Sequence, residues 1–200
     1  LLVGFEDPTG GPGMIVKDGV LEKMEMFITT EFNIKGLDFT VDHVTLEYLS
    51  AEESSLGVKQ FIMWGEVDLE VEGDVIDIIM GDSDQPGIVF SNGELTDLNL
   101  TVDSDIKASG FDFKTKDLTL TYEHHLNSVD RTYEISGTVD LTLTEGFEVT
   151  VTLGEADEGI PGIIVNTDSG DTKFQLDAFE VEIQSLKLGS LDFKEVDFKY

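Results

Sequence analysis

Three short segments of this sequence carry closely spaced oxygen-bearing side chains, which are the side chains that bind hard cations. Ca²⁺ takes roughly six to eight oxygen ligands, and short loops with alternate acidic residues often supply them. The segments are GDSDQPG, VDSDI and NTDSGDT, and the candidate ligands in them are Asp82, Asp84, Asp103, Asp105, Asn166, Asp168 and Asp171. Ca²⁺ is therefore the one cofactor that the sequence predicts.

A second interpretation of the same segments stays open. Asp and Asn favour turns because their side chains hydrogen-bond to nearby backbone groups. The third segment has an EF-type ligand spacing with a glycine at Gly170, but the distal bidentate glutamate and the flanking helices are missing. The equivalent of the first segment near the N-terminus reads FEDPTG, so the acidic pattern is not kept in every copy.

Catalytic motifs are missing from the sequence. It contains no GxSxG, no GxGxxG and no phosphate loop, and it has no cysteine for a thiolate nucleophile or metal site. His124 and His125 follow Glu123 in a predicted loop, where such a pair is more often solvated than metal-bound, and His43 stands alone. The carboxylates recur along strands and are not set across a cleft, as glycoside hydrolysis requires. We therefore expect no enzyme.

Aromatic side chains offer a further kind of site, a strip on which sugar rings stack. The candidates are Phe61, Trp64, Phe111, Phe113 and Tyr133. Their alternating placement favours packing in a core as the ordinary interpretation. Trp64 aligns with Ser136 of the next repeat, so we expect it to face outward.

Composition narrows the classes of partner. The chain has 42 Asp and Glu against 12 Lys and Arg, and a net charge of −30 opposes nucleic acids and anionic lipid surfaces. Such a charge indicates saline or calcium-containing surroundings, or serves solubility alone. At 40% hydrophobic residues the chain is expected to fold. No apolar run approaches the ~20 residues of a membrane span, and because residue 1 is Leu, we expect any signal or anchor outside this window.

An internal repeat organises the chain. PGMIV begins at Pro12, PGIVF at Pro86 and PGIIV at Pro161, which gives spacings of 74 and 75 residues. The same shift of 74 aligns LDFTVDHVTLEY at 37–48 with FDFKTKDLTLTY at 111–122. We therefore divide the chain into the end of a preceding repeat (1–11), unit 1 (12–85), unit 2 (86–160) and a partial unit 3 (161–200). The array is expected to continue in both directions.

Within a unit, apolar and polar residues alternate with a period of two, as in Leu98, Leu100 and Val102, which indicates half-buried strands. An elongated, all-β, β-solenoid-like array is our preferred fold. It rests on a sub-repeat of 22 residues and on the count of about five strands per unit, because an odd number of strands would reverse direction from unit to unit in one antiparallel sheet. Antiparallel β-sandwich repeats are the alternative.

The run GIVFSNGELTDLNLTVDSDI, followed by FDFKTKDLTLTYE and YEISGTVDLTL, resembles the tandem repeats of very large bacterial cell-surface and adhesin-like proteins. This resemblance implies an extracellular, multi-copy β architecture and no catalytic residue. The LxL periodicity is also similar to AsmA-like lipid-transfer proteins, whose β-groove shields lipid chains.

From these patterns and resemblances we expect a non-enzymatic structural segment of a large extracellular or cell-surface protein, with a scaffold, adhesion or fibre-forming role. Its partners would be the neighbouring repeats of the same chain and further copies of it. The alternatives are a lipid-conducting β-groove and a carbohydrate-binding module. An accessible apolar groove would favour the lipid conduit, whereas a closed core would favour the scaffold.

Overall fold

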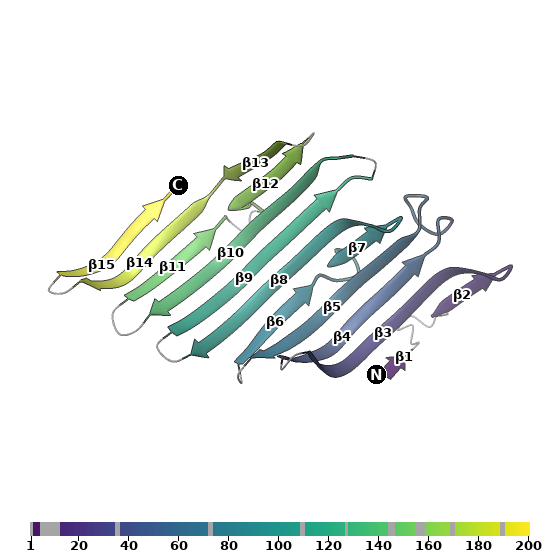
Figure 1. The fold of residues 1–200 in the computed structure, drawn as a ribbon, viewed down its shortest axis with the longest axis horizontal. Helices are drawn as coiled ribbons and strands as arrows, with labels where there is room; N and C mark the ends of the chain where they lie inside the picture. Colours follow the sequence, from purple (N-terminus) through teal and green to yellow (C-terminus); the bar gives the residue numbers. More distant parts are fainter. Residues whose placement is uncertain are drawn as a thin grey trace.

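The computed structural model describes residues 2–4, 13–34, 37–71, 74–108, 111–126, 128–143, 147–154, 159–168, 171–188 and 191–200. These residues form a single antiparallel sheet of 15 strands without a helix (Figure 1). The strands are β1 (Leu2–Gly4), β2 (Met14–Lys17), β3 (Val20–Ile34), β4 (Leu37–Leu49), β5 (Gln60–Val71), β6 (Asp74–Met80), β7 (Ile88–Ser91), β8 (Glu94–Ala108), β9 (Phe111–His124), β10 (Arg131–Leu143), β11 (Phe147–Leu153), β12 (Ile163–Asp168), β13 (Asp171–Leu176), β14 (Phe179–Leu188) and β15 (Leu191–Lys199). The prediction of an all-β fold is confirmed.

Two of the strands in a unit are halves of one strand position. β6 and β7 both pair antiparallel with β5 and with β8, and β6 lies along residues 101–104 of β8 while β7 lies along residues 94–98. β7 therefore continues the line of β6 after the connection at 81–87. β1 and β2 share β3 in the same way, and β11 and β12 share β10.

Because two strands share one position, the number of positions per unit differs from the number of strands, on which the preference for a solenoid rested. β6 and β7 together, then β8, β9 and β10, occupy four positions in the sheet before the next split pair, β11 and β12, begins. An even number of positions lets successive units keep the same strand direction in one antiparallel sheet. The count of about five strands per unit agrees with the structure, but the inference that their direction reverses from unit to unit was wrong, because two strands share one position, and the solenoid is not confirmed. The pairing is antiparallel, as the alternative required, but the described strands form one sheet and not a sandwich.

Short turns fix the register of the hairpins that follow each split. Asp18 and Gly19 join β2 to β3 with φ values of 52° and 79°, and Asn92 and Gly93 join β7 to β8 with 54° and 86°. Two central residues with positive φ are what the two-residue type I′ hairpin requires, and Asp-Gly and Asn-Gly are its preferred sequences. The two turns lie 74 residues apart, so this element of the repeat is visible in both sequence and structure.

A bulge opposite a glycine bends the sheet in both units. The β4–β5 register shifts between Val41 and His43, and β9 is irregular at Asp117, where φ is 52°. The strand that follows carries Gly65 in unit 1 and Gly137 in unit 2, with φ of 130° and 122°. Bulges and glycine kinks increase strand twist and bending. Because they recur at matching places, the bends line up across the sheet.

Candidate functional site

One side of the sheet is apolar along its length. Alternate residues of a strand share a face, and register partners on adjacent strands share it too. On β8 and β9 this face carries the directly paired side chains of Leu98 and Tyr122, Leu100 and Leu120, and Val102 and Leu118. We call this side of the sheet the apolar face.

Rows of short apolar side chains cross the strands on this face. The register links Val41 of β4 to Val67 of β5, then to Ile78 of β6 and Val102 of β8. A second row, beside the first, links Thr115 of β9 to Val139, Val151, Val181 and Phe198 on β10, β11, β14 and β15. The two rows together run from unit 1 into unit 2 and on to β15, and the polar pair Ser104 and Thr115 lies between their apolar members.

The centre of the apolar face is the core of the sheet. Val41, Val44 and Met80 are only 7%, 4% and 7% exposed. They pack with Ile28, Met63, Val67, Ile88 and Leu100. The described residues contain no second layer over this face, so the burial comes from neighbouring side chains on the same face. The apolar face is therefore packed side by side along the sheet.

The surface area shows how much of the chain stays uncovered. A compact monomer of 22.0 kDa exposes about 9,300 Å². This chain exposes 12602 Å². The surplus of about 3,300 Å² reflects the extended single sheet, which leaves surface open on both faces.

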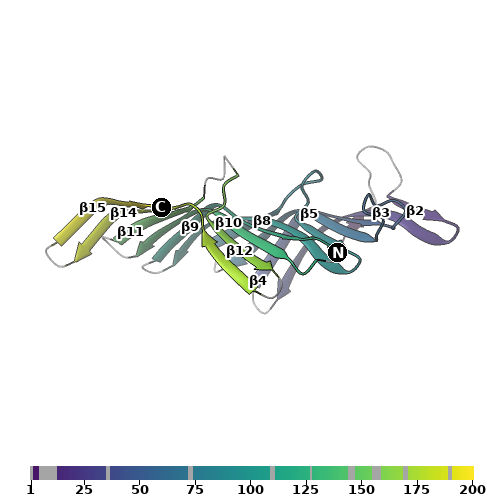
Figure 2. The same ribbon diagram turned by 90° about the horizontal axis from the view of Figure 1, so that it is seen from above.

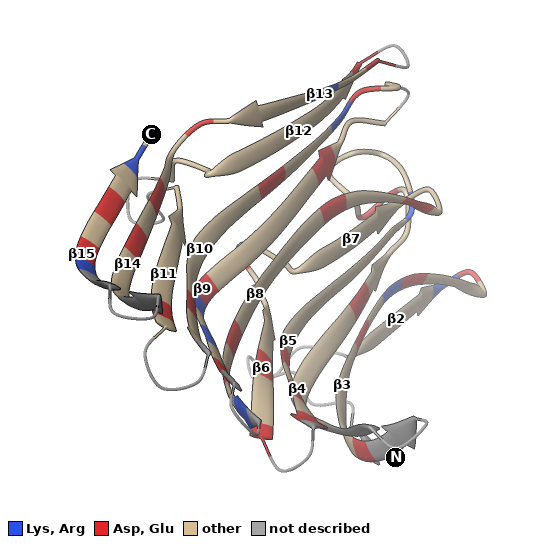
Figure 3. Ribbon diagram, turned by 60° about the vertical axis from the view of Figure 1, so that its left-hand side comes forward, with Lys and Arg blue, Asp and Glu red and all other residues tan. Residues whose placement is uncertain are grey.

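The opposite side, the polar face, carries a buried network of hydrogen bonds. Ser54 Oγ donates to Gln60 Oε1 at 2.6 Å, and Gln60 Nε2 donates to Ser91 Oγ at 3.3 Å. Ser91 Oγ lies 3.1 Å from Thr96 Oγ1, which donates to the carbonyl oxygen of Val89. This buried network ties the β4–β5 connection to β5, β7 and β8. Acidic side chains lie on strands from both ends of the sheet (Figure 3).

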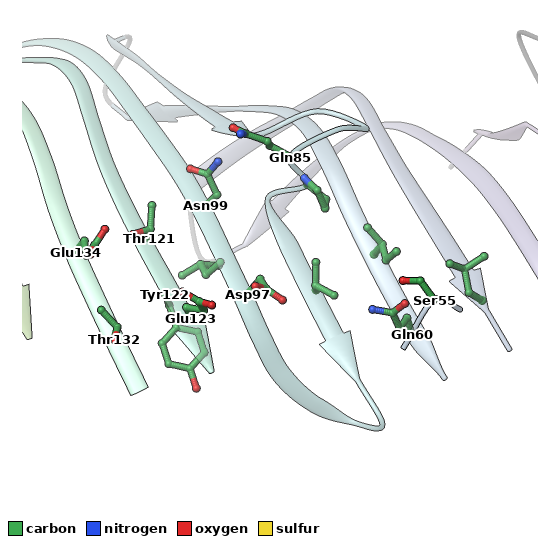
Figure 4. Close-up of a pocket in the computed structure, with 15 residues that line it drawn as sticks. Ser55, Gln60, Gln85, Asp97, Asn99, Thr121, Tyr122, Glu123, Thr132 and Glu134 are labelled. Carbon is green, nitrogen blue, oxygen red and sulfur yellow. The ribbon is translucent and has the colours of Figure 1, made fainter. Parts of the chain in front are cut away.

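The connection at 81–87 rises from the polar face (Figure 2). It borders an open hollow of about 580 Å³ that is also lined by β5, β8, β9 and β10. Figure 4 shows Gln85 and Asn99 at its upper edge, whereas the ring of Tyr122 points away from them. The carboxylates of Asp97 and Glu123, which are register partners, also line it. The described lining includes no lysine, arginine or histidine, although Glu123 lies 3.3 Å from His125, which stands outside the lining.

The residues predicted to bind calcium are spread over three places, and several already accept hydrogen bonds. Asp82 Oδ1 accepts from the backbone N–H groups of Asp84 at 2.7 Å and Gln85 at 2.9 Å. The bond from Gln85, and then that from Asp84, holds the pKa of Asp82 below its ordinary value of 3.8. Asp103 Oδ1 accepts from the backbone N–H of Asp117 at 2.6 Å.

The remaining candidate ligands have separate surroundings. Asp105 lies 3.4 Å from the ammonium of Lys107, and Asn166 Oδ1 accepts from Thr132 at 3.0 Å. Asp168 and Asp171 are register partners at the β12–β13 turn, whose Gly170 lies outside the described residues. Over the described ranges, no three acidic or histidine side chains converge in a way that would hold a metal. The calcium assignment stays a prediction.

The histidines have different environments. His124 is 8% exposed, with Nδ1 3.1 Å from the carbonyl oxygen of Asp130 and Nε2 3.5 Å from Glu94. His125 is exposed and lies 3.3 Å from Glu123. The two adjacent histidines therefore contact different partners.

The aromatic candidates divide between the two faces. Phe61, Phe113 and Tyr133 lie on the apolar face, because their register partners are Tyr48, Leu141 and Tyr122. Trp64 lies on the polar face, as its alignment with a serine predicted. The side chain of Phe111 is outside the described residues. Sequence reasoning missed Phe27 and His43, which share the polar face with Trp64, because nothing in their local pattern marks them.

Comparisons of this chain with family models, with curated proteins and with solved structures gave no match. In the part of the chain that the structure describes, no helix has the length and apolar character needed to cross a membrane.

Proposed function

We propose that the apolar face is a groove that binds the hydrocarbon chains of lipids. The observation that carries this proposal is the pair of apolar rows along one bent sheet that no described second layer covers. Each buried methylene of a bound chain contributes about 0.8 kcal/mol, so an acyl chain in such a groove gains enough to leave water. The resemblance to AsmA-like β-groove proteins supports the same function.

Lipid chains fit this face better than a second copy of the protein. Two copies would each bring a net charge of −30 to the contact. Bringing these charges together costs free energy, whereas an uncharged hydrocarbon chain brings no such cost. The acidic surface also supports a location outside the cell, in saline or calcium-containing surroundings, where counterions screen it.

A structural role in a long repeat array is the second candidate function. It is favoured by the even number of strand positions per unit, since such a sheet extends by adding units without changing strand direction. In that role, an elongated all-β scaffold at the cell surface would present its acidic polar face outward and use the apolar face for assembly.

The test measures acyl-chain binding to the purified chain by native mass spectrometry and by displacement of a fluorescent fatty acid. Leu100→Glu places a charge on the apolar face, and we expect it to abolish binding. Asn99→Glu is the matched control, because it adds the same charge one residue away on the polar face. Circular dichroism confirms that both variants are folded.

Two results would overturn the groove. One is no acyl-chain binding by the wild-type chain, and the other is equal binding by the Leu100→Glu and Asn99→Glu variants. Sedimentation of the lipid-free chain then tests the scaffold, which predicts assembly that Leu100→Glu disrupts and Asn99→Glu leaves intact.

A further inference from the structure

The polar face of unit 1 carries a group of aromatic side chains on three neighbouring strands. Phe27 of β3, Thr45 of β4 and Trp64 of β5 are direct neighbours in the register. The rings of Phe27 and His43 lie 5.0 Å apart, tilted by 37°. Phe27 and Trp64 are partly exposed, and His43 is exposed. We call Phe27, His43 and Trp64 the outer aromatic cluster.

Unit 2 has the same backbone arrangement without these rings. In its register, Thr101 of β8, Thr119 of β9 and Ser136 of β10 are neighbours in the same order. They occupy the places that Phe27, Thr45 and Trp64 occupy in unit 1. The strands, the bulge and the opposing glycine are all present in unit 2, so the fold does not depend on aromatic side chains at these places.

Unit 1 also lacks a hydrogen bond that unit 2 makes at the equivalent threonine. Thr119 lies 3.0 Å from the hydroxyl of Thr101 and donates to the carbonyl oxygen of Asp117 at 3.2 Å. Thr45 is 1% exposed, and its hydroxyl has no hydrogen-bond partner among the residues that the structure describes. A buried hydroxyl without a partner is destabilising. The cluster thus replaces a satisfied polar row by an aromatic one, which points to a role other than stabilising the sheet.

Carboxylates border the cluster on both sides. Glu25 and Glu47 are register partners one row above it, and Glu66 pairs with His43 below it. Glu47 binds Lys23 at 2.9 Å, whereas Glu66 is exposed. Aromatic faces bury the C–H faces of a sugar ring, and carboxylates accept hydrogen bonds from its hydroxyl groups.

We propose that the outer aromatic cluster binds a neutral saccharide chain. The rings of Phe27 and Trp64 provide the stacking surface, and Glu25 and Glu66 accept hydrogen bonds from sugar hydroxyls. The same carboxylates repel acidic saccharides and nucleic acids. Because the cluster lies on the opposite side of the sheet from the groove, this inference does not depend on lipid binding.

Trp64 is the only tryptophan in the chain, so its fluorescence reports directly on this site. The experiment titrates the protein with neutral hexasaccharides of glucose and of N-acetylglucosamine, and with a uronic acid hexasaccharide. We expect a neutral hexasaccharide to shift the emission of Trp64 and the acidic one to leave it unchanged. Phe27→Thr, which installs the residue found in unit 2, should weaken binding about tenfold.

Phe90→Thr is the matched control, because it makes the same change at an exposed residue of the apolar face and should leave saccharide binding unchanged. Trp64→Ser, again the unit 2 residue, should abolish binding measured by calorimetry while keeping the fold. The proposal is overturned if neither neutral hexasaccharide changes the emission, or if Phe27→Thr binds as tightly as Phe90→Thr. A shift produced only by peptides would assign the cluster to a protein partner and overturn it as well.

Discussion

The backbone of Gly65 lies so close to the carbonyl oxygen of His43 that a Cβ on Gly65 would overlap it. Gly137 stands in the same relation to the carbonyl oxygen of Asp117 in unit 2. The bulge and the glycine opposite it therefore depend on each other, because the bulge places a carbonyl group where only a residue without a side chain fits. We call this pair the bulge–glycine device. Its recurrence places the same irregularity in both units.

Replacing the glycine of this device should destabilise the sheet strongly. Gly65→Ala adds both a steric overlap and an unfavourable positive φ, so we expect a loss of roughly 3 kcal/mol of unfolding free energy. Gly93→Ala is the control, because this residue also has positive φ but its Cβ would meet no atom within 4 Å. It should lose only about 1 kcal/mol. Urea unfolding followed by circular dichroism measures both, and equal losses would contradict a steric role for Gly65.

Removing the hydroxyl group of Thr45 and removing that of Thr119 should change the unfolding free energy in opposite directions. Thr45→Val deletes a buried hydroxyl that has no partner among the described residues, so we expect unfolding free energy to rise by about 1 kcal/mol. Thr119→Val deletes a hydroxyl that bonds to Asp117 and Thr101, so unfolding free energy should fall by about as much. Denaturant midpoints of the two variants give the comparison. A loss of stability in Thr45→Val would mean that its hydroxyl has a partner in solution.

The strands were predictable because their signal is local. The alternation of Leu98, Leu100 and Val102 marks a half-buried strand, and the structure places these residues on β8 with one face apolar. The split strand was not predictable in this way. β6 and β7 look like two strands in sequence, and only their common pairing with β5 and β8 makes them one position.

The absence of a second layer over the apolar face in the described residues was beyond the sequence for a related physical reason. A period of two shows that one face of a strand avoids water, but the same pattern serves a face covered by a second sheet and a face covered by a ligand. The position of Trp64 was predictable from its alignment with Ser136. Its neighbour Phe27 was not, because the two come together only through the register of β3, β4 and β5.

The charge of the chain leads to a last prediction, on salt. Acidic residues such as Asp97 and Glu123 stand directly opposite each other on adjacent strands, and like charges in that arrangement are destabilising. Raising NaCl from about 10 mM to about 1 M shortens the screening length from roughly 30 Å to roughly 3 Å. We therefore expect the melting temperature to rise by several degrees, measured by circular dichroism. An unchanged melting temperature would show that repulsion among the −30 charges does not limit stability.

The same measurement separates screening from a specific calcium site. Screening alone predicts that CaCl₂ and MgCl₂ at matched ionic strength raise the melting temperature equally, because both supply a divalent cation. A specific site predicts a larger rise with calcium, because flexible oxygen-rich loops suit Ca²⁺ better than Mg²⁺. We expect equal rises, since Asp82 and Asp103 already accept backbone hydrogen bonds. An excess with calcium that disappears in an Asp168→Asn, Asp171→Asn double variant would instead place a calcium site at the β12–β13 turn.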